Sequence, residues 1–161
     1  MTSINIIDIE ASGLHFDSYP IEVALLVNGQ TFSWLIKPET AWHYWCETAE
    51  AMHGISRVML QEKGKRVNVV ATEILDVLKN TNGLLYSDAA DWDLDWMRTL
   101  FHAAKEPMPF HILSIYDLLQ KDQADSFKYT KSKLVESGRY RQHRAGEDVR
   151  LIFEAYITAS Q

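Results

Sequence analysis

The sequence has one cysteine, no long apolar run and no overall excess of positive charge. Because Cys46 stands alone, an internal disulfide is excluded and there is no sign of a cysteine-based zinc site, and a reducing, cytoplasmic location fits best. No apolar run approaches the roughly 18 residues that a membrane span needs, and no basic segment with a following apolar stretch opens the chain. We therefore expect neither a membrane span nor a leader peptide.

The charged residues are unevenly distributed along the chain. The formal net charge of −6 argues against a protein that coats polyanions over its whole surface. Residues 121–150, however, hold eight of the 16 lysines and arginines against five acidic residues. A basic lobe of this kind suits the binding of a phosphodiester backbone, although a solvated helix face has the same composition.

The length and the hydrophobic pattern predict a single α/β domain over residues 1–161. With 47% hydrophobic residues and no linker, the chain is long enough for one complete core. Asn28-Gly29 is a hairpin signal between two apolar runs, so the chain should open with three antiparallel strands. We expect strands at 3–9, 21–27, 30–36, 83–87 and 112–115, and helices at 47–52, from 56, 67–78, 92–104 and 144–158. This order predicts a mixed sheet with the first strand central and helices flanking it.

Two acidic residues at the end of the first predicted strand are the most informative feature. Asp8 and Glu10 lie two apart, so in an extended segment their carboxylates point to the same face. Two neighbouring acids repel each other, and a divalent cation such as Mg²⁺ or Mn²⁺ would offset their charge. An acidic pair on a solvated strand end is the alternative interpretation.

Further acids follow the fourth predicted strand, in the first turn of a helix. Trp92 and Trp96 are four apart and should share a helix face, where they could pack inward and fix Asp93 between them. Acidic residues also favour helix N-termini for capping reasons alone. Three more acids compete with Asp93 for a role at the site: Asp88, Asp91 and Asp95.

Near the C-terminus, a histidine precedes the last predicted helix. Residues five apart on one helix are about 140° out of phase. His143 and Asp148 can therefore meet at one site only if His143 lies on the loop before the helix. A lone histidine in such a loop is otherwise a surface residue or a cap.

Taken in order, these segments resemble the DEDDh 3′-to-5′ exonucleases, which include proofreading subunits and oligoribonuclease. Asp8 and Glu10 with Ser12-Gly13-Leu14 look like the first motif of that family, Trp92-Asp93 like the second, and His143 with Asp148 like the third. Met52-His53-Gly54-Ile55 resembles its His-Gly-Ile segment. The sister subgroup has a tyrosine where this chain has Arg144, so the histidine form matches better. The resemblance implies a ribonuclease H-like fold.

The resemblance also implies a mechanism and a set of site residues. Two Mg²⁺ or Mn²⁺ ions would be bound by Asp8, Glu10, Asp93 and Asp148, and His143 would act as the general base. The 3′ end of single-stranded DNA or RNA would be bound by Gly13, Leu14, Phe16, His53, Arg139 and Arg141. An aromatic cluster at Trp42, Tyr44 and Trp45 could stack bases, although it suits a protein core better.

The chain departs from the family pattern in two places. The second motif lacks the usual His-Asn and has Ser87-Asp88 instead, and Ala11 replaces the usual threonine of the first motif. A non-catalytic nucleic-acid-binding module and an endonuclease of the ribonuclease H type are the alternative functions. The sequence does not decide between DNA and RNA, or between a monomer and a homodimer.

Overall fold

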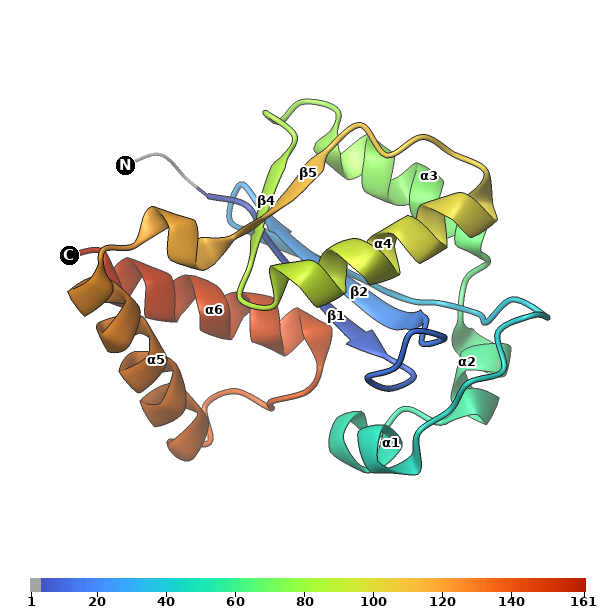
Figure 1. Cartoon of the computed structure of the whole chain (residues 1–161), viewed down its shortest axis with the longest axis horizontal. Coiled ribbons are helices and arrows are strands. Elements are labelled where there is room, and N and C mark those ends of the chain that lie inside the picture. The colour runs from blue at the N-terminus through green and yellow to red at the C-terminus, as the bar shows by residue number, and fades with distance from the viewer. Residues whose placement is uncertain (1–3) are drawn as a thin grey trace.

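Five strands form one mixed sheet in the computed structural model, which describes residues 4–161 (Figure 1). The strands are β1 (Ile6–Ala11), β2 (Pro20–Val27), β3 (Gln30–Leu35), β4 (Leu84–Ser87) and β5 (His111–Ser114). Their order in the sheet is β3-β2-β1-β4-β5, with β1, β2 and β3 antiparallel and β4 and β5 parallel to β1. The prediction of a mixed sheet with a central first strand is confirmed, while residue 3 of that predicted strand lies outside the described residues.

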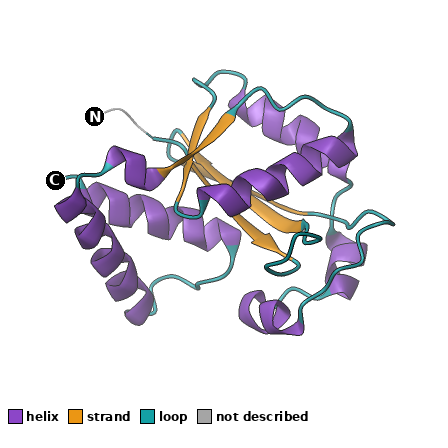
Figure 2. Ribbon diagram, in the orientation of Figure 1, coloured by secondary structure: helices purple, strands orange, loops and turns teal. Residues whose placement is uncertain are grey.

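Helices cover both faces of this sheet (Figure 2). They are α1 (Glu47–His53), α2 (Arg57–Lys63), α3 (Val67–Leu78), α4 (Ala90–Ala104), α5 (Lys121–Glu136) and α6 (Ala145–Ala159), with a 3₁₀ turn at Ile115–Leu118. One core cluster joins the sheet to α3 and α4, and another joins it to α5 and α6. Among residues 4–161, no helix combines the length and the apolar character that crossing a membrane requires.

The hairpin between β2 and β3 has the conformation that its sequence predicts. Asn28 and Gly29 both have positive φ angles, of 49° and 79°. Positive φ at both central residues defines the type I′ turn, whose twist matches that of the flanking strands. The hairpin prediction is therefore confirmed.

The alternation of side chains along β1 decides which way the two acids point. Ile7 and Ile9 are buried in the cluster with α3 and α4, whereas Ile6 is buried in the cluster with α6. Because successive side chains of a strand point to opposite faces, Asp8 and Glu10 share the face of Ile6. Both carboxylates thus point toward the side of the sheet that α6 covers.

Two parts of the second half of the chain differ from the prediction. No element was assigned to 121–136, where the structure has α5, since only Phe127 in this helix is buried and its apolar pattern is correspondingly weak. The last strand was expected to reach Ile115, but this residue begins the 3₁₀ turn, in which the Ser114 hydroxyl accepts a hydrogen bond from the Tyr116 N–H.

Candidate active site

The site is built around the C-terminal half of β1. Ile6 of β1 pairs with Tyr86 of the parallel strand β4, and an acid follows two residues later in each segment, Asp8 in β1 and Asp88 just after β4. On the other side of β1, Glu10 lies opposite Glu22 of β2. Two further acidic side chains, Asp88 and Glu22, therefore lie near Asp8 and Glu10 before any helix contributes one.

Asp93 joins this group from the first turn of α4, where it is only 1% exposed. The Ser87 hydroxyl, at the end of β4, donates a hydrogen bond of 2.6 Å to Asp93 Oδ2. Trp92 and Trp96 stack with ring centroids 5.3 Å apart, and Trp96 is buried while Trp92 is partly exposed. Asp93 is thus buried and held by Ser87, whereas Asp91 and Asp95 are exposed. The two tryptophans share a helix face as expected, but only Trp96 packs inward.

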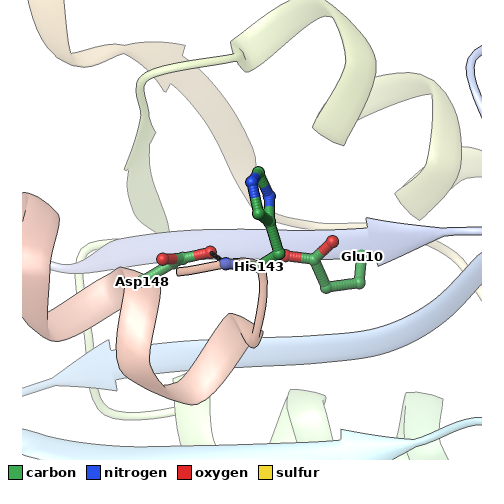
Figure 3. Close-up of side chains that lie close together, drawn as sticks. All are labelled: Glu10, His143 and Asp148. Carbon is green, nitrogen blue, oxygen red and sulfur yellow. Dashed lines mark hydrogen bonds between the residues drawn. The ribbon is translucent and has the colours of Figure 1, made fainter. Parts of the chain in front are cut away.

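His143 and Asp148 meet at the start of α6 (Figure 3). His143 lies on the loop before the helix with a φ of 65°, and its backbone N–H donates a 2.9 Å hydrogen bond to Asp148 Oδ2. Glu10, His143 and Asp148 each offer one ligand atom, and these atoms lie within 4.8 Å of one another. The loop position that the sequence required of His143 is the one that the structure has.

The carboxyl groups of the site strongly perturb one another. Burial raises the pKa of Asp8 well above its ordinary value, and the charges of Asp93 and Asp148 raise it further. Burial, followed by the Asp148 charge, raises the pKa of Glu10 to about 8. The pKa of Asp148 is raised to about 6, chiefly by burial. The cluster therefore resists carrying its full negative charge in the absence of a cation.

This donor set fits divalent metal ions. Among the described residues, the buried atoms Asp8 Oδ2 and Asp148 Oδ1 have no hydrogen-bond partner. Buried polar atoms are normally paired, so two unpaired carboxylate oxygens facing one site indicate that they serve a ligand. Hard cations such as Mg²⁺ and Mn²⁺ bind carboxylate oxygens, which are the donors that this site offers.

Lys131, which the sequence placed only in the basic lobe of residues 121–150, reaches the carboxylates from α5. Its ammonium donates a hydrogen bond to Asp88 Oδ2 and forms an ion pair with it. Burial would lower the pKa of Lys131, but the Asp88 charge and hydrogen bond outweigh burial and leave this pKa raised. The basic segment around Lys131 was visible in the sequence, but its pairing with Asp88 was not, because α5 was not predicted.

A second feature that the sequence did not reveal fixes the start of α6. Glu22 is buried on β2 and accepts hydrogen bonds from the Arg144 guanidinium, the shortest at 2.8 Å. It also accepts one of 2.7 Å from the backbone N–H of Ala145, the first residue of α6. Because Arg144 follows His143 directly, Glu22 holds the segment that presents His143 and Asp148.

Replacing Glu22 with Gln should lower the free energy of unfolding by about 2 kcal/mol, because hydrogen bonds to charged groups contribute about 1.5–3 kcal/mol. Gln keeps an acceptor for Ala145 but loses the charge that pairs with Arg144. Urea unfolding followed by circular dichroism would measure the difference, with the exposed Glu62→Gln as the matched control. Equal stability of the two variants would contradict this role of Glu22.

A cavity of about 340 Å³ adjoins the carboxylates and contains several of the predicted substrate-binding residues. Gly13, Leu14 and His53 line it together with Glu10 and His143. Gly13 has a φ of 155°, and a Cβ there would lie 2.7 Å from side-chain atoms of both Cys46 and Tyr44, so only glycine fits. Leu14 is 71% exposed and Phe16, just outside the cavity, is 87% exposed.

The predicted aromatic cluster is mostly engaged within the protein. Trp42 stacks on Tyr19 with ring centroids 5.1 Å apart, and the Trp45 indole N–H donates a 2.6 Å hydrogen bond to Glu50. Tyr44 lines the cavity and stacks on His15 at 4.4 Å. Of the three aromatic residues, Tyr44 is therefore the one placed beside the cavity.

The two predicted arginines lie in different surroundings. Arg139 forms an ion pair of 2.6 Å with Glu154 of α6. Arg141 lies beside Gly54, where an added Cβ would be 3.1 Å from the guanidinium. It also lines a groove with Arg144 and Gly146 at the start of α6. The structure brings Arg141, but not Arg139, to the His-Gly-Ile segment.

Comparisons with known proteins show a sequence family and a fold. The sequence model of the RNase_T exonuclease family matches residues 6–156. Among solved structures, Escherichia coli exonuclease I in complex with a dA16 oligonucleotide has a TM-score of 0.77 and 14% identity over 98% of this chain and 41% of its own. Exonuclease I from Methylocaldum szegediense has a TM-score of 0.75 and 15% identity over 98% of this chain and 40% of its own.

At such low identity, these structures establish the fold, which is ribonuclease H-like. The chain spans about two fifths of the length of the exonuclease I chains. A comparison with curated proteins gives no match.

Proposed function

Because the chain belongs to the exonuclease family whose sequence model covers residues 6–156, we propose that it removes nucleotides one at a time from the 3′ end of single-stranded DNA or RNA. One observation carries this proposal. Acids from β1, α4 and α6 converge on one spot beside His143, although they lie far apart in the sequence. The oligonucleotide bound to exonuclease I supports a single-stranded substrate.

Four carboxylates would hold two divalent ions, Mg²⁺ or Mn²⁺, at this site: Asp8, Glu10, Asp93 and Asp148. The unpaired oxygens of Asp8 and Asp148 support this assignment. When bound, the ions supply positive charge that activates water and stabilises the leaving 3′ oxygen. Burial and then mutual repulsion raise the pKa values of Asp8 and Glu10, and a cation would offset the negative charge that causes this repulsion.

His143 is proposed to accept the proton of the attacking water. Burial lowers the pKa of His143 and the nearby Lys131 charge lowers it further, so the imidazole is neutral near pH 7 and can act as a base. The hydrogen bond from its backbone N–H to Asp148 holds the backbone of His143 beside the carboxylates. In this position His143 would take the proton from a water molecule next to the acids that would bind the metal ions.

The cavity next to Glu10 is proposed to bind the terminal nucleotide. Gly13 allows the backbone to approach closely, while the exposed side chains of Leu14 and Phe16 offer apolar contact to bases. His53 Nδ1 accepts a 3.0 Å hydrogen bond from the Ile55 N–H, so its proton is on Nε2, which can only donate. Arg141, at the adjoining groove, is proposed to hold backbone phosphates.

A cleavage assay tests the proposal. With Mg²⁺ or Mn²⁺, 5′-labelled single-stranded DNA or RNA should give a ladder of products shortened by one nucleotide at a time, and excess chelator should abolish it. A circular single strand of the same sequence should remain intact because it has no 3′ end. Cleavage of the circle would support the ribonuclease H-type endonuclease, and binding without any cleavage would support the non-catalytic module.

A further inference from the structure

Lys131 is the lysine of α5 that points into the carboxylate site. Its side chain is 29% exposed and its ion-pair partner Asp88 only 10%. Lys128, one turn earlier on the same helix, is exposed and lies over the Tyr116 ring at 5.4 Å. Lys133 is also exposed and pairs with Glu136 on its own helix. The inward position of Lys131 is therefore specific to this residue and is not shared by the basic face of α5.

The charge of Lys131 acts on the proposed metal ligands and not only on Asp88. The charges of Asp8 and Asp148 act on the Lys131 ammonium in addition to the charge of Asp88, with which it is in contact. Asp88 likewise acts on Asp8, Asp93 and Asp148. The pair thus adds one acid and one fixed cation to the four proposed ligands. Two divalent ions would neutralise the four ligands, and Lys131 neutralises the fifth acid.

We propose that Lys131 competes with divalent ions for the carboxylates. Its ammonium, held by Asp88, partly neutralises these acids in the metal-free protein and so lowers their affinity for metal. This inference rests on the proposed metal-dependent function. An ammonium and a divalent cation repel each other strongly when they share a partly buried site, because the effective dielectric constant there is about 20 and not 80. The enzyme would then bind its ions only at a higher metal concentration than the four carboxylates alone would require.

If Lys131 competes with metal, its replacement should raise the affinity for metal. Removing the positive charge should tighten metal binding, whereas loss of an ordinary supporting contact would weaken it. Lys131→Met removes both the charge and the hydrogen bond, and Lys131→Gln keeps a donor for Asp88 while removing the charge. Lys131→Arg keeps the charge and should restore the affinity of the parent protein.

Isothermal titration calorimetry of the metal-free proteins with Mn²⁺ alone tests this proposal. Lys131→Met and Lys131→Gln should bind Mn²⁺ about tenfold more tightly than the parent, as expected from the loss of a like charge nearby. Lys131→Arg and the exposed control Lys128→Met should bind it as the parent does. The thermal midpoint should also rise more on Mn²⁺ addition in the Met and Gln variants, because tighter binding stabilises the folded state further.

The outcomes separate this inference from the proposed function. If the parent binds Mn²⁺ but the Met and Gln variants bind it equally well or more weakly, Lys131 does not compete with metal and the inference is overturned. If Lys131→Met does not fold, Lys131→Gln decides the matter alone. If the parent itself binds no Mn²⁺, the proposed metal-dependent function fails, and the inference fails with it.

Discussion

Replacing Asp8 with Asn should reduce nucleotide release by at least about 10³-fold and greatly weaken Mn²⁺ binding. A metal ion contributes several kcal/mol to transition-state stabilisation, and each 1.36 kcal/mol is a tenfold change in rate. Asp8 lies at the centre of the group, since the charges of Asp93, Asp148, Glu10 and Asp88 all act on it. The amide oxygen of Asn is a weaker ligand for hard cations because it carries no charge.

The same substitution should stabilise the metal-free protein. Burial and repulsion from neighbouring acids both destabilise the charged form of Asp8, and Asn removes that repulsion because it carries no charge. The thermal midpoint in excess chelator should therefore rise above that of the parent, while Mn²⁺ should raise it less than in the parent. The matched control is Asp95→Asn on α4, where the side chain is exposed. An Asp8→Asn variant that cleaves and binds Mn²⁺ like this control would remove Asp8 from the site.

Replacing His143 with Ala should slow cleavage by about 10²–10⁴-fold, the usual contribution of general base catalysis. Mn²⁺ affinity should change little, because the proposed ligands are all carboxylates. The deficit should be smaller at high pH, since hydroxide becomes more abundant there and needs no base to form it. Single-turnover rates over a range of pH, together with Mn²⁺ titrations, would measure both effects.

The His143→Ala variant also tests whether His143 binds metal. His143 lies within ligand distance of Glu10 and Asp148, so it could also bind metal directly. A parallel loss of Mn²⁺ affinity in His143→Ala would identify it as a ligand. Near-normal cleavage at neutral pH would exclude both roles and leave His53 as the next candidate. The control is His102→Ala, which changes an exposed histidine on α4.

The first half of the fold could be predicted because its signals are local. The alternation of apolar residues in β1 and the Asn28-Gly29 turn each depend on residues close together in the sequence. The position of His143 before α6 could also be predicted, since helix geometry allows it to meet Asp148 in no other way. The roles proposed for these residues remain predictions.

The missed features depend on partners that are distant in the sequence. Glu22 and Arg144 are separated by 122 positions, and no local pattern reports their contact. In the sequence, Lys131 does not differ from the neighbouring lysines, because α5 has too few buried residues to show which face of the helix points inward. Its role becomes visible only once Asp88 of the β4–α4 connection lies opposite it.

The packing of α6 against β1 and β2 also determines when the residues of the site come together during synthesis of the chain. β1, with Asp8 and Glu10, leaves the ribosome first, whereas His143 and Asp148 follow more than 130 residues later. In a nascent chain, Asp8 and Glu10 therefore lack His143 and Asp148 as neighbours until α6 is released and docks on the sheet.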